Sequence, residues 1–339
     1  MSEELRALCA FALAGALALI LVPVARRVAL RTGFMDHPVE YKAHASATPY
    51  LGGAGVLSAF ALSAAVFGNA APRFWLIVAL ALGLVVVGSI DDRRTLHPGV
   101  RFGAQLLAGV ALYAADLRWE VSGSVWIDLP VTLLWVAGLA NAFNLLDNID
   151  GACSTTAAVS AAGVGALALA RGDERTAAVA FALSGACAAF LAFNLAGPAR
   201  IFLGDGGSVP IGFLIASLAL VAAGSTGSDA VLVAVPLAGV AIFDTTLVVL
   251  SRTRRGISIL TGGRDHTTHR LLGLFGSTRR VAAFLATGQA VLCGVTLLIW
   301  DGSERTVGIA AVAYVVVGAL LLAVFERPSL APAPREQSA

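Results

Sequence analysis

Long apolar segments alternate with short polar ones along almost all of the 339 residues. A helix needs roughly 17–25 apolar residues to cross a bilayer, and segments close to that length occur eleven times. They cover residues 7–24, 51–68, 74–90, 102–115, 130–146, 152–170, 176–195, 209–223, 230–250, 281–299 and 307–325. The pattern predicts an all-α integral membrane protein, a polytopic bundle of about eleven (10–11) transmembrane helices in which 102–115 and 209–223 are the shortest spans.

The charges around the first apolar segment predict the orientation of the bundle. Glu3 and Glu4 precede this segment and Arg26 and Arg27 follow it, which is the reverse of a cleaved signal peptide. We therefore expect an N-terminus outside the plasma (inner) membrane and no separate targeting sequence. Alternation then places in the cytoplasm the segments 25–50, 91–101, 147–151, 196–208, 251–280 and 326–339. These segments hold 17 of the 23 lysines and arginines, as the positive-inside rule expects of cytoplasmic loops.

The composition agrees with a membrane location and excludes a soluble globular domain, because 58% of the residues are hydrophobic and only 13% are charged. The mean hydropathy is +0.84. The four cysteines lie in apolar stretches without the spacing of a zinc site or a disulfide framework, and we interpret them as small packing residues. Residues 1–325 are interpreted as one polytopic transmembrane domain, and the Pro- and Ala-rich residues 326–339 as a disordered cytoplasmic tail.

All dense polar clusters fall in the segments expected on the cytoplasmic side. The first is Asp91-Asp92 at the end of the third span, followed by Arg93 and Arg94. Two adjacent carboxylates repel each other, and a bound divalent cation or a shared proton would relieve that repulsion. One of the two could also act as a base. The alternative is a solvated helix end that the two arginines neutralise.

A polar stripe marks the inner end of the fifth span. Its members recur at every third position and are Asn141, Asn144, Asp147 and Asp150. Neighbours at this spacing share a helix surface, but the stripe winds around an ideal helix unless the helix breaks, for which Gly151 is the candidate. Carboxylates at membrane depth cost roughly 2.5–3.5 kcal/mol each on insertion scales and are functional by default. The alternative is plain hydrogen bonding between helices.

Two further clusters suit phosphate. Asp205 lies in the glycine-rich turn from Gly204 to Ser208 directly before a helix, where backbone N–H groups favour phosphate and a carboxylate could hold a bridging metal ion. The alternative is a simple helix cap. The largest inner loop, 251–280, holds seven arginines together with His266 and His269, which gives a basic surface suited to a pyrophosphate and to anionic lipid. No third ligand of zinc type lies near the two histidines.

These clusters, in this order, resemble the polyprenyl-phosphate N-acetylhexosamine-1-phosphate transferase superfamily, the WecA/MraY/TagO-like glycosyltransferase family 4. The resemblance extends from Gly33 to about Arg280. The strings that carry it are Asp36-His37-Pro38 with Lys42, His44 and Pro49-Tyr50-Leu51-Gly52-Gly53; Gly88 to Arg93; Asn141 to Gly151; Phe202 to Ser208; Ile242-Phe243-Asp244; and Arg264-Asp265-His266 with His269-Arg270-Leu271. One such string is weak evidence, but several in the same order are specific.

The resemblance implies a Mg²⁺-dependent enzyme, with Mn²⁺ as an alternative ion, that moves a HexNAc-1-phosphate from a UDP-sugar to undecaprenyl or another polyprenyl phosphate and releases UMP. The reaction would take place at the cytoplasmic membrane surface, as the first membrane step of cell-envelope polysaccharide or teichoic-acid-type cell-wall assembly. The partners would be the UDP-HexNAc, the lipid and the membrane, with no nucleic acid, and the resemblance suggests a homodimer. Direct attack by the lipid phosphate is favoured over a covalent aspartyl intermediate.

The resemblance also implies roles for individual residues. The metal ligands would be Asn144 and Asp205. The catalytic residues would be Asp91, which deprotonates the lipid phosphate, Asp92, which supports the metal and the base, Asp147, and His266 and His269, which contact phosphate and sugar. The substrate-binding residues would be Lys42, His44, Arg101, Asp150, Asn194, Phe202, Arg264 and Arg270, with Arg101 on the pyrophosphate and Asp150, Asn194 and Phe202 on the uridine.

Two departures from the family pattern bear on the donor substrate. The fifth position of the DDxxD motif is Thr95, so this position has no obligatory catalytic part. The loop reads His266-Thr267-Thr268-His269, without the adjacent histidine pair common in the family or the triple histidine of the MraY-like branch. We therefore expect the WecA/TagO-like branch with UDP-GlcNAc as donor, and a phospho-MurNAc-pentapeptide transferase is the alternative.

A secondary transporter is the alternative from another class, since intramembrane carboxylates also mark ion and substrate paths. Transporters place such groups near the bilayer midplane and usually contain repeats, whereas these groups cluster at inner helix ends and the sequence has no repeat. Asp244 is the one residue that would suit a transporter, and its other interpretation is a hydrogen bond between helices. A purely structural membrane scaffold would not need so many polar clusters on one face.

Overall fold

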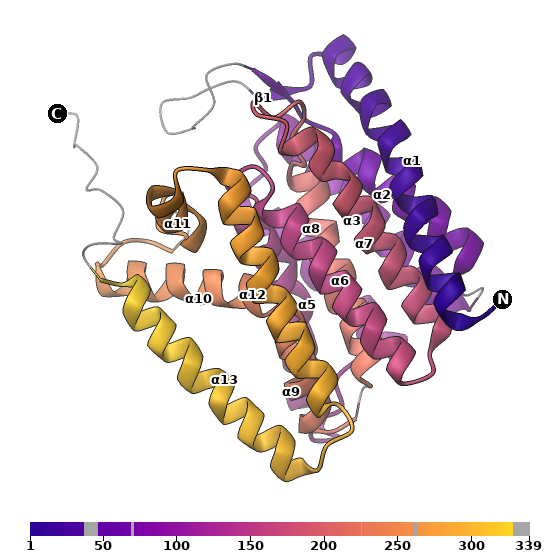
Figure 1. Cartoon of the computed structure of the whole chain (residues 1–339), viewed down its shortest axis with the longest axis vertical. Helices are drawn as coiled ribbons and strands as arrows, with labels where there is room; N and C mark the ends of the chain where they lie inside the picture. The colour runs from indigo at the N-terminus through magenta and orange to yellow at the C-terminus, as the bar shows by residue number, and fades with distance from the viewer. Residues whose placement is uncertain (37–46, 69–70, 225, 260–262, 328–339) are drawn as a thin grey trace.

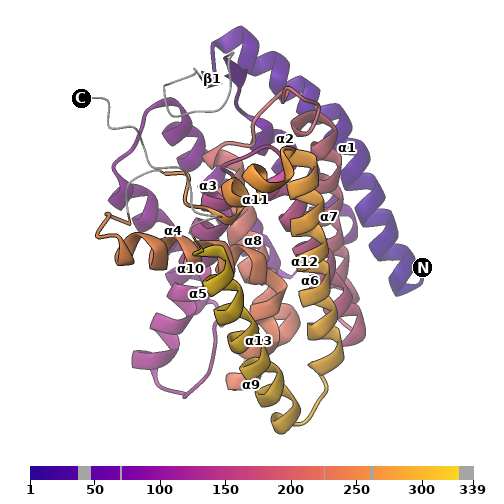
Figure 2. The same ribbon diagram turned by 60° about the vertical axis from the view of Figure 1, so that its left-hand side comes forward.

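The computed structural model describes residues 1–36, 47–68, 71–224, 226–259 and 263–327. In these residues the chain forms a bundle of helices, seen from two sides in Figures 1 and 2. The helices are α1 (Glu3–Thr32), α2 (Gly52–Phe67), α3 (Pro72–Arg93), α4 (Pro98–Ala114), α5 (Val125–Leu146), α6 (Ala152–Ala170), α7 (Glu174–Asn194), α8 (Asp205–Ala223), α9 (Ser228–Ala234), α10 (Gly239–Arg254), α11 (Thr267–Phe275), α12 (Thr278–Ile299) and α13 (Glu304–Phe325). The short strands β1 (Met35–Asp36) and β2 (Thr48–Pro49) pair antiparallel. The all-α bundle predicted from the sequence is confirmed.

Nine helices within the described residues are long and apolar enough to cross a membrane, so the chain is a multi-pass membrane protein. α2 and α4 coincide with two more of the predicted spans but have only 16 and 17 residues. The predicted number of eleven therefore requires that both of these short helices cross as well. α8, predicted as one of the shortest spans, has 19 residues because it already begins at Asp205 in the glycine-rich turn.

The span predicted at 230–250 is not one straight helix. α9 is followed by a 3₁₀ turn over Val235–Ala238, and α10 begins at the next residue. Pro236 explains the break, because proline has no N–H to donate and its ring clashes with the preceding turn. Figures 1 and 2 both show α10 lying crosswise to α12 and below α11. The break therefore redirects the chain toward the segment that holds the two histidines.

α8 is the central helix of the bundle, with 94% of its apolar segment buried. It packs against α2, α3, α5 and α6. Small residues bring other helices close together: a β-carbon on Gly185 of α7 would lie 2.2 Å from the Phe11 backbone oxygen of α1. Such contacts are the usual means of helix association in a membrane. α13 differs, since only 6% of its apolar segment is buried, and its side chains are available to lipid.

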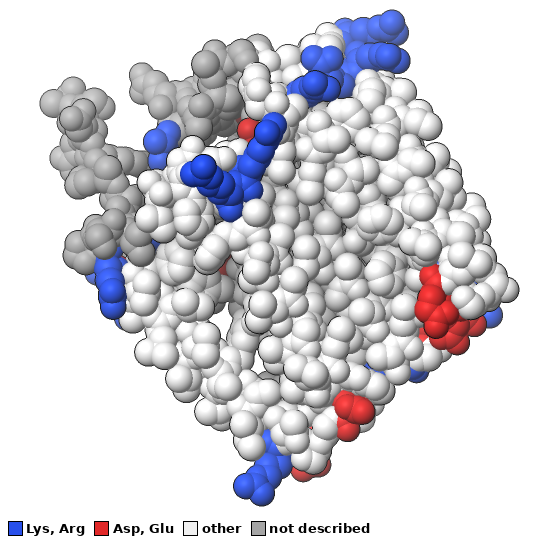
Figure 3. Space-filling view, in the orientation of Figure 1, with Lys and Arg blue, Asp and Glu red and all other residues white. Residues whose placement is uncertain are grey.

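The polar segments predicted on one face do lie at one end of the bundle. Hydrogen bonds join them directly, from Arg101 to Asp205, from Thr268 to Asn148, from Arg279 to Leu195 and from Arg26 to Arg200. Figure 3 shows most of the visible Lys and Arg side chains toward this end, which carries β1 and α11 in Figure 1, and acidic side chains near the N-terminus. The predicted clusters therefore meet at the basic end of the molecule.

α3 meets the start of α8 through Gly88. A β-carbon on Gly88 would lie 2.4 Å from the Asp205 backbone oxygen, which is too close for any side chain. A β-carbon on Gly83, in the same helix, would meet no atom within 4 Å. The two glycines therefore form a matched pair, one at a backbone contact and one in open space.

Gly88→Ala is expected to destabilise the protein by about 1–3 kcal/mol, the usual cost of overpacking, and to lower its thermal unfolding midpoint. Gly83→Ala should leave the midpoint unchanged or raise it, because alanine is the better helix former. Thermal unfolding of both purified variants in detergent provides the measurement. Equal midpoints for the two variants would contradict the close contact between α3 and α8.

Candidate functional site

The glycine-rich turn before α8 is held in close contact with α2. Gly204 has a φ of +74°, a conformation that favours glycine. A β-carbon on Gly53 would lie 2.2 Å from the Gly207 α-carbon, so the two backbones touch without intervening side chains. This packing fixes the backbone of Asp205, the residue predicted to bind a metal ion.

Asp92 supplies the cap of α8 from a different helix. Its two carboxylate oxygens accept hydrogen bonds from the backbone N–H groups of Asp205 at 2.8 Å and of Gly206 at 3.1 Å. A carboxylate in this place satisfies N–H groups that a helix start leaves unpaired and interacts favourably with the helix dipole. Both oxygens of Asp92 are thus engaged, and the structure gives Asp92 a positioning role for Asp205.

Arg101 lies between two of the predicted site carboxylates. Its Nη1 is 2.8 Å from Asp91 Oδ2 and 3.0 Å from Asp205 Oδ2. The other Asp91 oxygen accepts a hydrogen bond from the Leu96 backbone N–H at 2.6 Å. Asp91 is buried while the Arg101 side chain is 36% exposed, so the guanidinium can leave the carboxylates toward solvent or a ligand.

Asn144 reaches the same carboxylate from α5. Its side-chain nitrogen donates to Asp205 Oδ1 at 2.8 Å and to Ser208 Oγ at 3.0 Å. Ser208 Oγ in turn donates to the Gly204 carbonyl at 3.0 Å. The predicted metal ligands Asn144 and Asp205 are therefore in direct contact, and turning the Asn144 amide over would present its oxygen in the same place.

Asp147 follows the end of α5 and is partly buried. Within the described residues its carboxylate accepts no hydrogen bond, and it lies at the negative end of the α5 dipole. Burial, and then the negative charges of Asp205, Asp92 and Asp150, raise the pKa of Asp147 well above its usual value. Like charges nearby therefore add to the effect of burial in disfavouring the ionised form of Asp147.

The chemistry of these donors fits a hard divalent cation. Mg²⁺ prefers carboxylate and amide oxygens, and such oxygens are available from Asp205, Asp147 and Asn144. In the described residues no three acidic, histidine or cysteine side chains are close enough to hold a metal as they stand. Arg101 and the Asn144 amide nitrogen contact the Asp205 oxygens. A cation would replace these two contacts.

The predicted histidines lie at the start of α11. His266 Nδ1 is 2.8 Å from Asp244 Oδ2, and the Thr267 backbone N–H donates to the other Asp244 oxygen at 2.7 Å. Thr268 Oγ1 donates to Asn148 Oδ1 at 2.5 Å, which joins this turn to the loop between α5 and α6. The alternative interpretation of Asp244, a hydrogen bond between segments, is therefore the observed one.

His269 lies on the same turn, with its ring centroid 6.2 Å from that of His266. Burial, and then the positive charges of His266 and the exposed Arg264, lower the pKa of His269 to about 4. His269 is thus neutral at physiological pH and can serve as a hydrogen-bonding group but not as a cation.

Arg270, predicted to bind substrate, is instead buried within the protein. Its guanidinium donates to the carbonyls of Asp265 and Phe325, to Ser251 Oγ and to the Glu326 carboxylate. These bonds tie α11 to α10 and to the end of α13, so Arg270 connects elements of the fold, and its substrate contact stays a prediction. Burial favours the neutral form of Asp265, but ion pairs with Arg252 and Arg255 outweigh it and lower the Asp265 pKa.

Asn194 also has a structural position. Its side-chain oxygen accepts from the Gly151 N–H at 2.6 Å and its nitrogen donates to the Ile201 carbonyl at 3.2 Å. Asn194 therefore connects two loops, and both ends of its amide are engaged by the protein.

Phe202, predicted with Asn194 to bind the uridine, pairs through its backbone with Pro49 and Gly52. Its ring centroid lies 6.2 Å from that of Tyr50.

The remaining predicted residues are placed as follows. Asp150 is half-buried in the loop that contains Asp147, and Arg264 is exposed before α11. Lys42 and His44 lie outside the described residues. The structure thus brings together Asp91, Asp92, Arg101, Asn144, Asp147 and Asp205 at the ends of α3, α4, α5 and α8, with the α11 turn attached through Asn148.

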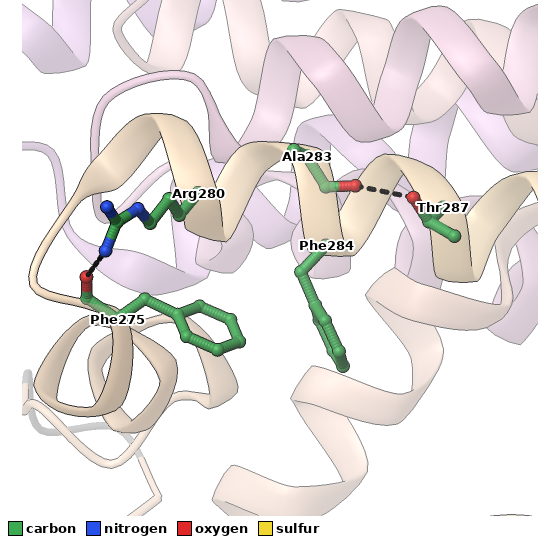
Figure 4. A pocket seen from close by; sticks show the side chains of 5 residues that line it. All are labelled: Phe275, Arg280, Ala283, Phe284 and Thr287. Carbon is green, nitrogen blue, oxygen red and sulfur yellow. Dashed lines mark hydrogen bonds between the residues drawn. The ribbon is translucent and has the colours of Figure 1, made fainter.

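A hollow of about 330 Å³ lies elsewhere, between α11 and α12 (Figure 4). It is lined by Phe275, Arg280, Ala283, Phe284 and Thr287, with the Phe275 and Phe284 rings beside each other. Arg280 donates to the Phe275 carbonyl at 3.2 Å. No carboxylate lines it, so the hollow is separate from the candidate site.

Two contributors were absent from the predicted site. Ser208 was treated only as part of the glycine-rich turn, although its hydroxyl receives the Asn144 amide. Asp244 was recognised within a family string but without a partner, since 22 residues separate it from His266. The sequence signals for Asp244 were the family string Ile242-Phe243-Asp244 and a polar residue inside an otherwise apolar span.

Comparisons with known proteins show which family this chain resembles. The family model described as glycosyl transferase family 4 matches residues 74–223, which include the carboxylate cluster. A probable undecaprenyl-phosphate N-acetylglucosaminyl 1-phosphate transferase of Bacillus subtilis is 27% identical over 83% of this chain and 81% of the relative. An undecaprenyl-phosphate alpha-N-acetylglucosaminyl 1-phosphate transferase of Yersinia pestis is 30% identical over 79% and 77%. A decaprenyl-phosphate N-acetylglucosaminephosphotransferase of Mycolicibacterium smegmatis is 30% identical over 86% and 82%.

The low pKa of His269 predicts a pH-dependent stability. In the unfolded chain this side chain takes up a proton near its usual value of 6.5, while in the folded protein it does so only near pH 4. The unfolded state therefore binds more protons between these values, so the contribution of His269 becomes unfavourable as pH falls from 6.5 to 4. His269→Gln removes the titration. The measurement is the thermal unfolding midpoint of the variant minus that of the native protein. This difference should be more favourable to the variant at pH 5 than at pH 8. An identical difference at both pH values would refute the lowered pKa of His269.

Proposed function

The chain belongs to glycosyl transferase family 4, and on that premise we propose that it transfers N-acetylglucosamine 1-phosphate to a polyprenyl phosphate lipid. The family predicted from the motifs is confirmed by the matches over residues 74–223 and over most of the chain. Relatives named for transfer to undecaprenyl and to decaprenyl phosphate share this activity class, which makes the chain a phosphotransferase. The acceptor is accordingly assigned as a polyprenyl phosphate without a chain length.

The donor we propose is UDP-N-acetylglucosamine. An oxygen of the lipid phosphate attacks the phosphorus that carries the sugar, the bond from that phosphorus to the bridging oxygen breaks, and UMP leaves. Phosphoryl transfer of this kind depends mainly on positioning and on neutralising charge. The observation that carries the proposal is the contact of Asp205 with Arg101 and Asn144 at the capped start of α8.

Arg101 is the group we expect to move when the donor binds. A guanidinium that already bridges two carboxylates can exchange them for pyrophosphate oxygens, with which it forms charge-assisted hydrogen bonds. Departure of Arg101 leaves Asp91 Oδ2 free, while the Leu96 N–H still holds the other oxygen. Asp91 is then placed to accept the proton of the lipid phosphate as a general base.

Mg²⁺ is the cofactor we propose, with Mn²⁺ as the alternative. Asp205, Asp147 and the Asn144 amide oxygen would hold it, and when bound it would supply positive charge to the pyrophosphate. The raised pKa of Asp147 is consistent with a carboxylate whose ionised form needs a cation. Asp92 takes no part in the transfer itself, because its carboxylate holds the Asp205 backbone in place.

We further propose that the site lies on the cytoplasmic face of the inner membrane and that the N-terminus lies on the other side. The basis is the gathering of arginines at the end that carries the site, which the positive-inside rule assigns to the cytoplasm. A transporter is disfavoured by the same arrangement, since the carboxylates lie at helix ends and Asp244, its best candidate, is bonded to His266.

The activity is tested by UMP release from UDP-N-acetylglucosamine and a polyprenyl phosphate by the purified protein. Asp205→Asn and Asp91→Asn should each lower kcat by at least about 100-fold, comparable to the loss of a major electrostatic group. Removal of divalent cations should abolish turnover, and Mg²⁺ should restore it. Asp116→Asn, the same change at an exposed turn between α4 and α5, should have no effect. Turnover without a metal, or full activity in both site variants, would refute the proposal.

The orientation is tested with single cysteines in a variant whose four native cysteines are alanine. Ala47→Cys precedes β2 at the end that carries the site, and Asp301→Cys lies in the turn between α12 and α13 at the opposite end. In intact cells an impermeant thiol reagent should label position 301 and leave position 47 unlabelled until the membrane is opened. If the reagent labelled only position 47 in intact cells, the proposed orientation would be wrong and the reverse one correct.

A further inference from the structure

Asp244 and His266 form a buried pair beside the candidate site. Asp244 is fully buried, with an exposed fraction of 0%, and His266 is 4% exposed. We propose that Asp244 is a positioning residue that fixes the His266 ring so that its unprotonated Nε2 accepts a hydrogen bond from an O–H or N–H group of the donor sugar. This inference rests on the proposed function and adds Asp244 to it, as a residue that acts by orienting His266.

The two hydrogen bonds at Asp244 fix both the place and the proton of the imidazole. Oδ1 accepts the Thr267 backbone N–H at 2.7 Å, which orients the carboxylate plane. Oδ2 lies 2.8 Å from His266 Nδ1, and an ionised carboxylate can only accept there, so Nδ1 carries the proton. The other ring nitrogen, Nε2, has no hydrogen bond within the described residues and is the atom left for a ligand.

The turn that carries His266 is attached to the loop next to the carboxylate cluster. The bond from Thr268 Oγ1 to Asn148 Oδ1 is 2.5 Å long and joins α11 to the residue after Asp147. The turn that carries His266 is thereby joined to the loop that contains Asp147, and Arg264 and His269 lie on either side of His266 in the sequence.

A purely structural role does not account for a carboxylate at this place. The Thr267 N–H could be capped by a neutral serine or asparagine at no charge cost, whereas a buried carboxylate is expensive unless it is paired and hydrogen-bonded. What the carboxylate adds is a preference for the imidazole forms with a proton on Nδ1. In the neutral form Nε2 then keeps its lone pair for a ligand, and second partners of this kind typically orient functional histidines.

Isosteric variants separate positioning from structure. Asp244→Asn keeps an oxygen for the Thr267 N–H but places an N–H opposite His266 Nδ1, which reverses the preferred proton position. His266→Asn keeps a nitrogen near the position of Nδ1 for Asp244 but has no counterpart of Nε2. Asp128→Asn is the matched control, because Asp128 is equally buried and accepts the Val121 and Ser122 backbone N–H groups at a distant loop.

In the UMP-release assay Asp244→Asn should lower kcat by about 10–100-fold, the usual effect of removing a second partner, with a smaller change in KM for the donor. His266→Asn should be at least as impaired. The double variant should be no worse than His266→Asn alone, since Asp244 acts through that ring. Asp128→Asn should keep the native kcat. Unchanged kcat in Asp244→Asn, or additive losses in the double variant, would overturn the positioning role.

The proton position can be measured without activity. In protein labelled with ¹⁵N-histidine, the His266 signals are those that vanish in His266→Asn, and they should report a proton on Nδ1 in the native protein. In Asp244→Asn the proton should move to Nε2. A native His266 with its proton only on Nε2 would refute the inference. If the native protein released no UMP, the proposed function would fail, whereas this measurement would still decide whether Asp244 controls the histidine.

Discussion

The hydrogen bonds from the start of α8 to the Asp92 carboxylate are the interaction on which the rest of the site depends. α8 is the most buried of the long helices, and a buried helix start with unpaired N–H groups is costly. α3 meets that need by supplying a carboxylate, and Gly88 allows it to come close enough to do so. The same contact sets the direction of Asp205, so the packing of the bundle and the placement of its reactive groups have one physical origin.

Charged groups around this contact are paired between helices. Arg101 of α4 holds carboxylates of α3 and α8, Arg270 of α11 holds the end of α13, and Asp244 of α10 holds His266. An unpaired charge near the bilayer is expensive, so the pairs assemble the helix ends before any substrate arrives. Asp147 differs, since within the described residues its carboxylate accepts no hydrogen bond. The partly exposed Arg101 side chain nevertheless remains able to exchange partners.

Much of this arrangement could be predicted from the sequence. Crossing a bilayer requires long apolar helices, so the spans followed from hydropathy, and the motif order correctly grouped Asp91, Asp205 and Asn144. A motif identifies a residue but does not show where its hydrogen bonds go. Those of Asn194 and Arg270 go to loop and helix ends, and the substrate contacts expected of both stay predictions. The pairing of Asp244 with His266 had no periodic signal, since it depends on the break at Pro236 that turns α10 beneath α11.

The glycine contacts around α8 limit how this site can diverge during evolution. Gly53, Gly88 and Gly207 touch neighbouring backbone, so a side chain at any of them would displace Asp205 rather than reshape the space around a sugar. The half of the site built on α2, α3 and α8 is therefore nearly closed to variation. Under the proposed function, we expect changes in sugar preference to arise in the turn before and within α11, where Arg264 is exposed and His269 is only partly buried. The fold thus separates a closely packed part around Asp205 from a part with more exposed side chains.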